Sequence, residues 1–374
     1  MKKSFIIFII VSVFLGSCIN RNREITVDMP TGIDSVYHAR GFNISYFDNY
    51  ISVDIRDPWD TLKMRQKYIL VDKDSILPAN LPEGVIIRIP VERAVIYTSV
   101  HTALAEQMGV LDKVVGVCEP EYIISKSVLD KIEEGKIEDL GSSTSPNIER
   151  IMDIKSEIII ASPFENSGYG VAEKLGIPIV EAADYMESHP LGRAEWIRFY
   201  GLLFGERGKA DSMFFAVVQN YNRLKQLTAE VGKRPTVMLE RKYGASWFVP
   251  SGDSYIGTIH ADAGADYIFS NYRDSGNTPL SFETVLDKGV HADYWLFKYD
   301  TKRDMTYSDL ADEYPPYRNF DPFKNKKIYI CNTILTPYYD DITLHPDWIL
   351  EDLIYIYHPN LLPGHQMKYY QKMK

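Results

Sequence analysis

The sequence has few cysteines, no excess of positive charge and, beyond its first residues, no long apolar run. Three cysteines in 374 residues, with no CxxC pair, argue against a structural zinc site and against an iron–sulfur cluster. The formal net charge of −10 argues against a nucleic-acid partner, which would require a basic surface. Beyond the N-terminal segment, no apolar run approaches the roughly 18 residues of a transmembrane helix.

The common signatures of catalysis are also missing. The sequence contains no GxSxG nucleophile elbow, no Walker A loop and no HExxH pair. Gly168-Tyr169-Gly170 lacks the third glycine of a dinucleotide-binding loop. We therefore expect a binding protein rather than an enzyme, with no cofactor and no metal ion held by the protein alone.

The N-terminal segment indicates the compartment. Met1-Lys2-Lys3 is basic, and residues 5–15 form an apolar run of about eleven residues, too short to cross a bilayer. The run ends in Leu15-Gly16-Ser17-Cys18, which resembles a bacterial lipoprotein signal cleaved before the cysteine. This resemblance implies that residues 1–18 are a signal peptide and that Cys18 carries the lipid that tethers a soluble domain outside the cytoplasm. The alternative is a secretory signal in which the cysteine is coincidental.

Residues 19–93 are predicted to be a short polar tether followed by a β extension. Apolar and polar residues alternate in residues 42–47, 50–55 and 68–71, and turn residues separate these segments. A period of two interrupted by turns predicts a small antiparallel sheet. We expect this sheet to pack on the first lobe of the main body.

Residues 94–190 are predicted to form that first lobe. Apolar strand segments alternate there with segments of helical period, which is typical of a parallel sheet with helices on both faces. The predicted strands are residues 94–99, 114–118, 157–162 and 177–181. The predicted helices precede Gly109, cover residues 146–154 and end at Leu175.

One long helix is predicted in the middle of the chain, over residues 207–231. Its apolar residues recur in steps of three and four and so share one face: Ala210, Met213, Phe214, Val217, Tyr221, Leu224 and Val231. Gly232 is the expected stop. Such a helix spans roughly 36 Å, the diameter of a small domain. With a helix over residues 191–204 it forms a linking segment, residues 191–232, which we interpret as a strut between two lobes.

Residues 233–374 are predicted to repeat the design as a second lobe. The predicted strands are residues 236–240, 267–269, 294–297 and 327–331, and the helices are residues 254–263, 281–288 and 348–357. The predicted fold class is therefore α/β, with two doubly wound parallel-sheet lobes (three-layer αβα) joined by one long helix. Cys118 and Cys331 fall in different lobes, so no disulfide is expected.

The two lobes also share an internal repeat. Glu149 and Asp153 lie four residues apart, as do Glu283 and Asp287, and each pair leads into an acidic residue followed by an apolar strand. The same order of features in both halves suggests two lobes related by pseudo-twofold symmetry.

In parallel α/β sheets, ligands bind beyond the carboxyl ends of the strands. That rule selects loops in both lobes that are rich in aromatic residues and carry several cations. The candidate cleft residues are Ser99, His101, Tyr122, Ser162, Phe164, Arg241, Lys242, Trp247, Phe248 and Tyr338. Aromatic walls with a few cations suit a flat, anionic, conjugated ligand. The alternatives are ordinary packing at the lobe edges and, for His101, a hydrogen-bonded structural role in place of contact with a metal or an anion.

The lipoprotein signal, the two α/β lobes, the long helix and the repeated segments resemble the class III substrate-binding proteins of bacterial ABC importers. The resemblance covers about residues 91–360, and Asn147-Ile148-Glu149-Arg150-Ile151 is its most specific part. It implies a periplasmic, lipid-anchored protein that captures a metal chelate in a cleft between its two lobes and delivers it to a permease dimer in the inner membrane. It also implies that Glu149 and Glu283 meet arginines of the permease. From the residues alone, both are simply acids in a first helical turn, where the helix dipole favours them.

Within that class, an iron complex (a ferric siderophore or haem) is the expected cargo, and a corrinoid is the alternative. Ser143 and Ser162 stand where the cobalamin carrier has cleft tryptophans, whereas Phe248 matches an aromatic position of that carrier. Two further alternatives are a chelatase-like enzyme on the same scaffold and a surface lipoprotein that receives cargo for an outer-membrane transporter. The N-terminal β extension is not part of the resemblance.

Overall fold

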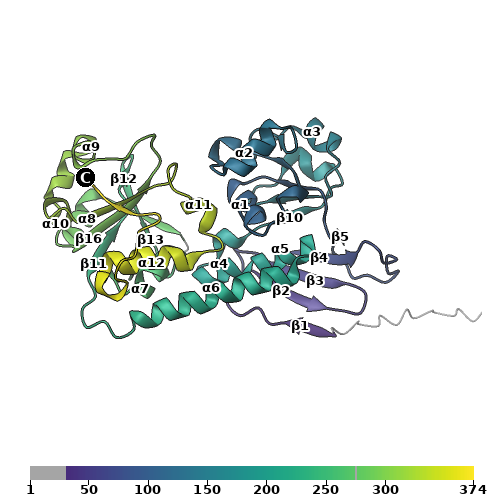
Figure 1. The fold of residues 1–374 in the computed structure, drawn as a ribbon, viewed down its shortest axis with the longest axis horizontal. Helices are drawn as coiled ribbons and strands as arrows, with labels where there is room; N and C mark the ends of the chain where they lie inside the picture. Colours follow the sequence, from purple (N-terminus) through teal and green to yellow (C-terminus); the bar gives the residue numbers. More distant parts are fainter. Residues whose placement is uncertain (1–30, 274–275) are drawn as a thin grey trace, which may run out of the picture.

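The computed structural model describes residues 31–273 and 276–374. Two α/β lobes stand side by side above a layer of helices, and a separate sheet lies beside this layer under the first lobe (Figure 1). The predicted signal segment and Cys18 lie outside the described residues. Within the described ranges, no helix combines the length and the apolar character that crossing a bilayer requires.

The N-terminal extension is a five-stranded sheet with its strands in chain order. The strands are β1 Gly32–Asp34, β2 Phe42–Tyr46, β3 Ile51–Arg56, β4 Met64–Asp72 and β5 Val85–Ile89. The three alternating segments form β2, β3 and β4 and pair antiparallel, which confirms the prediction. β5, which the alternation did not reveal, pairs parallel to β4.

This sheet is joined firmly to the rest of the molecule. Phe42 packs edge-on against Trp196, with ring centroids 5.0 Å apart. The buried carboxylate of Glu195 accepts hydrogen bonds of 2.7–3.1 Å from the backbone N–H groups of residues 37–39. Lys73 also pairs with Glu157 of the first lobe at 2.7 Å. Because a buried carboxylate is stable only with such partners, the bonds to Glu195 fix the segment that leads into β2. The ion pair between Lys73 and Glu157 confirms the predicted packing of the sheet on the first lobe.

Lobe 1 is built on a five-stranded parallel sheet. Its strands are β6 Ala94–Ile96, β7 Val114–Val117, β8 Glu138–Asp139, β9 Ile158–Ala161 and β10 Ile179–Glu181. Its helices are α1 Ser99–Gln107, α2 Lys126–Glu133 and α3 Ile148–Asp153, with shorter 3-10 turns η1 Leu111–Lys113, η2 Pro120–Tyr122, η3 Gly170–Lys174 and η4 Asp184–Met186. The helix predicted to end at Leu175 is the 3-10 turn η3, and α2 and β8 are additions to the prediction.

The strand order of lobe 1, β10-β9-β6-β7-β8, reverses direction at β6. Because crossover connections are right-handed, this reversal places the connecting segments on opposite faces of the sheet. The lobe is therefore doubly wound, as predicted. The reversal also makes a switch point between the carboxyl ends of β6 and β9, where folds of this type bind ligands.

Lobe 2 repeats the arrangement with a reversal at β11. Its main sheet has the order β14-β11-β16-β17-β18, with strands β11 Thr236–Leu239, β14 Asp266–Tyr267, β16 Tyr294–Tyr299, β17 Ile328–Asn332 and the antiparallel edge strand β18 Gln371–Lys372. Its helices are α7 Tyr255–Asp262, α8 Phe282–Gly289, α9 Tyr307–Glu313, α10 Asp321–Lys324, α11 Tyr338–Asp341 and α12 Pro346–Tyr357, with turns η5 Pro315–Asn319 and η6 Pro359–Leu361. A small antiparallel sheet, not predicted, consists of β12 Lys242–Tyr243, β13 Ser246–Pro250 and β15 Asn277–Leu280.

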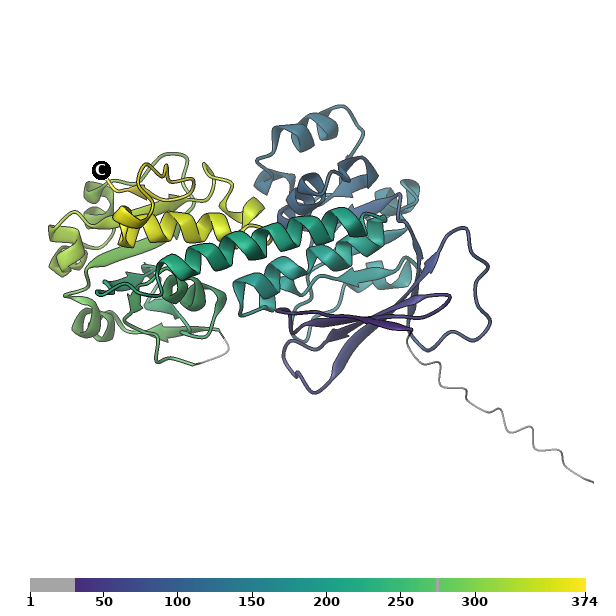
Figure 2. The ribbon, with the colours of Figure 1, turned by 60° about the horizontal axis from the view of Figure 1, so that its bottom comes forward.

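Three helices link the lobes: α4 Pro190–Glu195, α5 Ile197–Phe204 and α6 Arg207–Leu227. The long helix α6 runs beneath both lobes, with the yellow helix α12 alongside it (Figure 2). The apolar face predicted for α6 is buried at five positions: Ala210, Phe214, Val217, Tyr221 and Leu224. The strut is therefore confirmed, and the segment predicted as one helix before it is the pair α4 and α5.

The predicted end of the strut at Gly232 is wrong. The helix ends at Leu227, and Thr228 is its C-terminal cap. The buried Thr228 hydroxyl lies 2.9 Å from the carbonyl oxygen of Lys225 and 2.7 Å from that of Asp262. These contacts fix the chain in a turn that the sequence period alone does not show.

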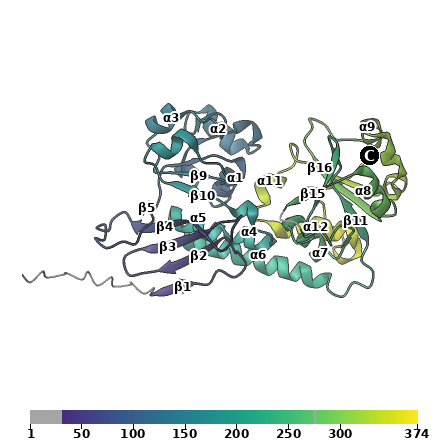
Figure 3. The ribbon, with the colours of Figure 1, turned by 180° about the vertical axis from the view of Figure 1, so that it is seen from behind.

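The lobes meet where α1 packs against α11, which lies between them (Figure 3). The Gln107 side-chain amide donates hydrogen bonds to the carbonyl oxygen of Asp340 at 3.1 Å and to the carboxylate of Asp341 at 2.9 Å. Cys118 and Cys331 are both buried and both free, as predicted.

Candidate ligand-binding site

A cavity of about 770 Å³ opens at the carboxyl edge of the lobe 1 sheet. Segments that follow all five strands line it: Tyr97 and Thr98 after β6, Glu119 after β7, Ser143, Thr144, Ser145, Pro146 and Ile148 after β8, Ser162, Phe164, Ser167, Gly168, Tyr169, Gly170 and Val171 after β9, and Tyr185 after β10. This is the edge selected by the carboxyl-end rule. The volume falls within the roughly 300–1,000 Å³ of small-molecule pockets.

The lining combines hydroxyl groups with aromatic rings. Thr98, Ser143 and Ser162 supply hydroxyls, and Phe164 and Tyr169 are among the rings. Among the described residues that line the cavity, Glu119 is charged, and none is an arginine, lysine or histidine. The cavity therefore offers hydrogen bonds and apolar surface but no positive charge of its own.

The loops around the cavity are held by specific bonds. Glu119 has a left-handed backbone (φ 56°), and its N–H donates to the carbonyl oxygen of Gly141 at 2.8 Å. Its carboxylate accepts a 2.6 Å hydrogen bond from the Ser143 hydroxyl. The Tyr185 hydroxyl donates to the carbonyl oxygen of Pro163 at 2.6 Å. These bonds join neighbouring loops, so the cavity wall is formed before a ligand arrives.

Lobe 2 exposes large apolar side chains on the loops that follow its strands. Tyr243, at the end of β12, is 80% exposed. Ile334 and Leu335, on the loop between β17 and α11, and Tyr339, in α11, are each about half exposed. Tyr122, which the sequence nominated on lobe 1, is 65% exposed on η2, outside the cavity lining. Apolar groups thus remain in water at the carboxyl ends of both sheets, where contact with a ligand or a partner would cover them.

The cations predicted for the cleft are already engaged. Arg241 pairs with Glu313 at 2.5 Å. The Lys242 ammonium lies 5.2 Å from the centroid of the Tyr314 ring and donates to the carbonyl oxygen of Gly244. Arg241 is therefore paired with an acid, whereas the contacts of Lys242 with a ring and a carbonyl oxygen leave its positive charge in place. Neither residue lines the lobe 1 cavity.

A largely buried lysine, Lys298, lies near these loops. Lys298 is bonded to the carboxylate of Glu240. Burial by itself lowers the pKa of Lys298, but the Glu240 carboxylate outweighs burial and raises the pKa above its ordinary value. Glu240 follows β11 and Lys298 lies within β16, so this ion pair, with no net charge, joins the carboxyl ends of two neighbouring strands of lobe 2.

The prediction that Trp247 lines the cleft is corrected. Its side chain is completely buried, packs against Trp295 with centroids 5.6 Å apart, and donates its N–H to the carbonyl oxygen of Leu239 at 2.9 Å. Neighbouring residues of β13 face opposite sides, so Phe248 is the exposed one, at 39%. The wide indole belongs to the lobe 2 core.

His101 also has a structural position. Its ring is buried between the Thr98 hydroxyl, at 2.5 Å from Nδ1, and the carboxylate of Asp184, at 2.6 Å from Nε2. It does not line the cavity, and Ser99 beside it, the first residue of α1, does not either. Of the two interpretations given for His101, the geometry favours the structural one. Within the described residues, no group of three His, Cys, Asp or Glu side chains could hold a metal ion.

Tyr338 is likewise buried, at 1% exposure, in contrast to the prediction. Its ring packs against Tyr369, with centroids 5.8 Å apart, and lies 5.9 Å from the Lys298 ammonium. Its neighbour Tyr339 is the residue that reaches solvent. Of the ten nominated cleft residues, the cavity therefore contains Ser162 and Phe164.

Glu149 and Glu283 occupy equivalent positions. Each is the second residue of its helix, α3 or α8, and each follows an N-cap, Asn147 or Ser281, whose side chain accepts a backbone N–H. Both carboxylates are exposed. Backbone and Ser281 hydrogen bonds lower the pKa of Glu283, so it is charged at neutral pH.

Several cavity residues were not nominated from the sequence. Thr98 lies within the predicted strand segment 94–99 but beyond the end of β6, and Tyr185 lies beyond the last strand of lobe 1. Ser143 and Ser145 follow β8, a two-residue strand with no apolar run to reveal it. The carboxyl-end rule could have selected Thr98 and Tyr185, whereas β8 left no signal in the sequence.

The fold and the cavity define a two-lobed α/β binding protein. The chain belongs to the periplasmic binding protein family, which it matches over residues 94–335. It is similar to an uncharacterized lipoprotein of Methanocaldococcus jannaschii, 26% identical over 403 aligned positions that cover 98% of this chain and 95% of the relative. A second uncharacterized lipoprotein of that organism is 27% identical over 328 positions, covering 82% of this chain and 80% of the relative.

Solved structures share the fold at low sequence identity. The Helicobacter pylori protein CeuE with Ni(II) bound superposes with a TM-score of 0.59 at 16% identity, covering 75% of this chain and 88% of that one. A periplasmic heme-binding protein of Pseudomonas aeruginosa gives 0.57 at 15%, covering 76% and 98%. The periplasmic vitamin B12-binding protein of Vibrio cholerae gives 0.51 at 16%, covering 71% and 96%. The fold is that of the class III substrate-binding proteins, as the sequence resemblance implied.

Proposed function

We propose that this protein captures an iron complex, either a ferric siderophore or haem, in the lobe 1 cavity and delivers it to an ABC importer. The observation that carries the proposal is the cavity of about 770 Å³ at the carboxyl ends of five parallel strands. Its aromatic and hydroxyl lining suits a chelate, because rings pack on the flat ligand while hydroxyls bond to its oxygen atoms. The exposed apolar side chains of lobe 2 supply a second contact surface.

The charge of the cavity narrows the choice of chelate. Glu119 is the carboxylate in the described lining, and Arg241 on lobe 2 is paired with an acid. Inside the lobe 1 cavity a strongly anionic chelate would lose its hydration without gaining a positive partner, which is costly. We therefore expect a neutral ferric hydroxamate to bind more tightly than a ferric catecholate, with haem between them.

Delivery requires a membrane anchor and a docking surface. Under this proposal Cys18 carries the lipid anchor in the periplasm, and the exposed carboxylates of Glu149 and Glu283 meet a permease dimer in the inner membrane. Their equivalent positions on two capped helices support this role, since a symmetric pair of permease subunits would meet one acid from each lobe.

A binding screen tests the proposal. The full chain, purified in detergent, is titrated with a ferric hydroxamate, a ferric catecholate, hemin and cyanocobalamin, and binding is followed by quenching of tryptophan fluorescence. One of the iron complexes should bind, and the Phe164→Ala variant should bind it at least tenfold more weakly, since a stacked ring contributes about 1.4 kcal/mol or more. Stronger binding of cyanocobalamin would support the corrinoid alternative.

Two results would oppose the proposal. Binding of none of the four probes would remove the assignment to this class of cargo. Loss of iron from hemin during the incubation would instead support the chelatase-like alternative.

A further inference from the structure

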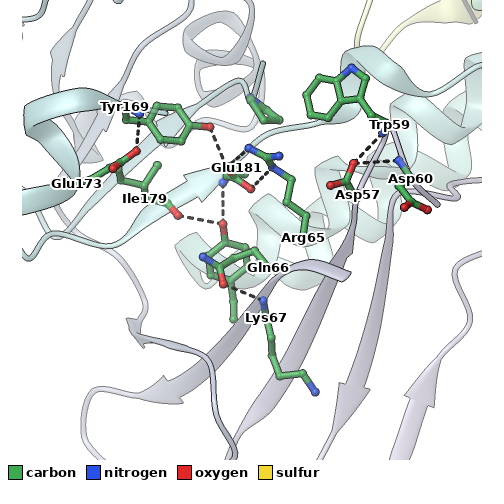
Figure 4. A network of polar contacts seen from close by, with 12 residues as sticks. Asp57, Trp59, Asp60, Arg65, Gln66, Lys67, Tyr169, Glu173, Ile179 and Glu181 are labelled. Carbon is green, nitrogen blue, oxygen red and sulfur yellow. Dashed lines mark hydrogen bonds and ion pairs between the residues drawn. The ribbon is translucent and has the colours of Figure 1, made fainter. Parts of the chain in front are cut away.

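The N-terminal sheet reaches the wall of the ligand cavity through one buried carboxylate, that of Glu181. The guanidinium of Arg65, on β4, donates two hydrogen bonds to it, at 2.6 Å from Nε and 2.8 Å from Nη2. The hydroxyl of Tyr169 donates a third, at 3.2 Å. Figure 4 shows Arg65 and Tyr169 approaching Glu181 from different sides. Since Tyr169 lines the cavity, this network connects the sheet to the ligand site.

The contact is fixed on both sides of Glu181. Tyr68, also on β4, is completely buried, and its hydroxyl accepts the N–H of Glu181 at 2.8 Å and donates to the carbonyl oxygen of Ile179 at 2.9 Å. The side chains of Arg65 and Glu181 are 20% and 10% exposed. A two-pronged bond between an arginine and a carboxylate with little access to water is strong and directional.

The loop that carries Tyr169 has little regular structure of its own. Residues 163–170 form an irregular connection between β9 and η3, with an isolated bridge between Phe164 and Ser167. The Tyr169 backbone N–H donates to the carboxylate of Glu173 at 2.6 Å. Phe164, Ser167 and Gly168 are shared between the cavity and a second, more open hollow of about 480 Å³. The loop is therefore a wall common to both spaces.

The N-terminal sheet lines that second hollow. The turn before β4 contributes Trp59 and Lys63, and Arg65 lies with its guanidinium 5.3 Å from the centroid of the Trp59 ring. The sheet thus reaches the loop through the bonded network at Glu181 and faces it across the hollow.

We propose that the N-terminal sheet is a working part of the ligand site and that Arg65 is its positioning residue, acting through Glu181 on Tyr169. The inference rests on the proposed function in taking the lobe 1 cavity as the ligand site. Arg65 itself does not line the cavity, so its effect on a ligand passes through the position of Tyr169 and its loop. The alignment with the Methanocaldococcus jannaschii lipoprotein covers 98% of this chain, whereas the family match begins at residue 94. The segment that forms the sheet therefore lies outside the family match but largely within the alignment with this relative.

The chain offers a matched control. Lys73, directly after β4, pairs with Glu157 of lobe 1 at 2.7 Å, and neither residue lines the cavity. Arg65→Met and Lys73→Met each remove one ion pair between the sheet and lobe 1, but only Arg65→Met interrupts the route to Tyr169. The two full-length variants are compared by thermal unfolding, by amide hydrogen exchange and by titration with the four probes named above.

Amide exchange in residues 163–170 should rise by about tenfold in Arg65→Met and stay unchanged in Lys73→Met, since a charge-assisted bond is worth about a factor of ten or more. Exchange in lobe 2 should stay unchanged in both. Glu181→Gln should reproduce the effect of Arg65→Met, and Arg65→Lys should give a smaller one because lysine cannot make the two-pronged bond. For a probe that binds, Arg65→Met should weaken binding several-fold. In a protein that already carries Tyr169→Phe, the same substitution should cause little further loss of affinity.

Unchanged exchange of residues 163–170 in Arg65→Met would overturn the inference, and so would an equal change in Lys73→Met. Additive losses of affinity in the double variant with Tyr169→Phe would overturn it as well. The exchange comparison needs no ligand, so failure of all four probes would count against the proposed function and leave this inference to be decided by exchange alone.

Discussion

His101 Nε2 and Asp184 Oδ1 lie 2.6 Å apart, and both side chains are almost entirely buried. Arg193 approaches the other carboxylate oxygen of Asp184 at 3.4 Å, and the Thr343 hydroxyl donates to it at 3.3 Å. His101 belongs to α1 of lobe 1, Arg193 to the linking helix α4, and Thr343 to lobe 2. This one carboxylate therefore joins three parts of the molecule.

Removing the Asp184 carboxylate should destabilise the whole protein. Asp184→Ala leaves His101 and Arg193 buried without their acid, and the expected loss is about 3–5 kcal/mol in the free energy of unfolding. Denaturant unfolding at neutral pH measures it. Asp60→Ala, which breaks an exposed pair with Lys63, is the control and should have little effect. Equal effects of the two substitutions would show that the buried network does not stabilise the fold.

The same group predicts a loss of stability in acid. Burial raises the pKa of Asp184, but His101 and Arg193 outweigh burial and hold the pKa below its usual range. A carboxyl whose pKa is lowered by folding stabilises the protein above its unfolded pKa, and this contribution disappears as the pH falls through the folded pKa. We expect the free energy of unfolding to fall below about pH 4. Asp184→Asn should show a smaller fall over that range, and an identical pH profile for variant and parent would refute the assignment.

Asp340 should have the opposite pH dependence. Burial, reinforced by the nearby carboxylates of Asp341 and Glu106, raises the pKa of Asp340 to about 6. The folded state therefore holds this proton more tightly than the unfolded state, so stability decreases as the pH rises from about 4 to about 6. Asp340→Asn should stabilise the protein at pH 7 by about 1 kcal/mol and should have no effect at pH 4. The gain at pH 7 is smaller than the full pKa shift implies, because solvent screens a partly exposed group. A gain that is the same at both pH values would contradict this prediction.

Trp247 and Phe248 are neighbours with opposite expected roles. Trp247→Ala empties a buried site and should cost about 3–5 kcal/mol in the free energy of unfolding. Phe248→Ala removes a partly exposed ring and should change the free energy of unfolding little. It should lower the affinity for any probe that contacts lobe 2. Unfolding and probe titration on both variants measure the difference. Loss of affinity without loss of stability in Trp247→Ala would return that residue to the cleft.

Much of this fold was readable from the sequence because period and turn residues are local signals. The buried face of α6, from Ala210 to Leu224, follows directly from steps of three and four residues. The strands that were missed are those with weak local patterns. β8 has two residues, β12 and β13 form a short hairpin, and β15 pairs with β13 from further along the chain, Leu280 opposite Trp247.

The binding site was harder to predict, because burial of a side chain depends on its partners. The carboxyl-end rule selected the edge of lobe 1 at which the cavity opens, and Ser162 and Phe164 line this cavity. The same rule cannot tell which aromatic residue of a loop turns inward. Trp247 and Tyr338 are taken into the core by rings that the sequence does not place beside them, such as Trp295 and Tyr369.

The strut predicts limited motion on ligand binding. α6 is continuous over Arg207–Leu227 and packs along α12 of lobe 2 and α5, so a large hinge movement would expose its buried face. Crystals grown with and without the iron complex that binds should superpose with a lobe rotation of only a few degrees. A wide closure of the lobes would show that the strut bends or slides.

The paired acids predict a separation between transport and binding. Glu149→Ala with Glu283→Ala should abolish uptake of the iron complex in cells while leaving its affinity for the purified protein unchanged, because both carboxylates are exposed and neither lines the cavity. Asp153→Ala with Asp287→Ala is the matched control, since these exposed acids lie four residues further along the chain, Asp153 at the end of α3 and Asp287 within α8. The control should transport normally if the permease meets the first turns of the two helices. A fall in affinity in the glutamate variant would place these residues at the ligand, and equal loss of uptake in both double variants would point to total negative charge in place of two specific contacts.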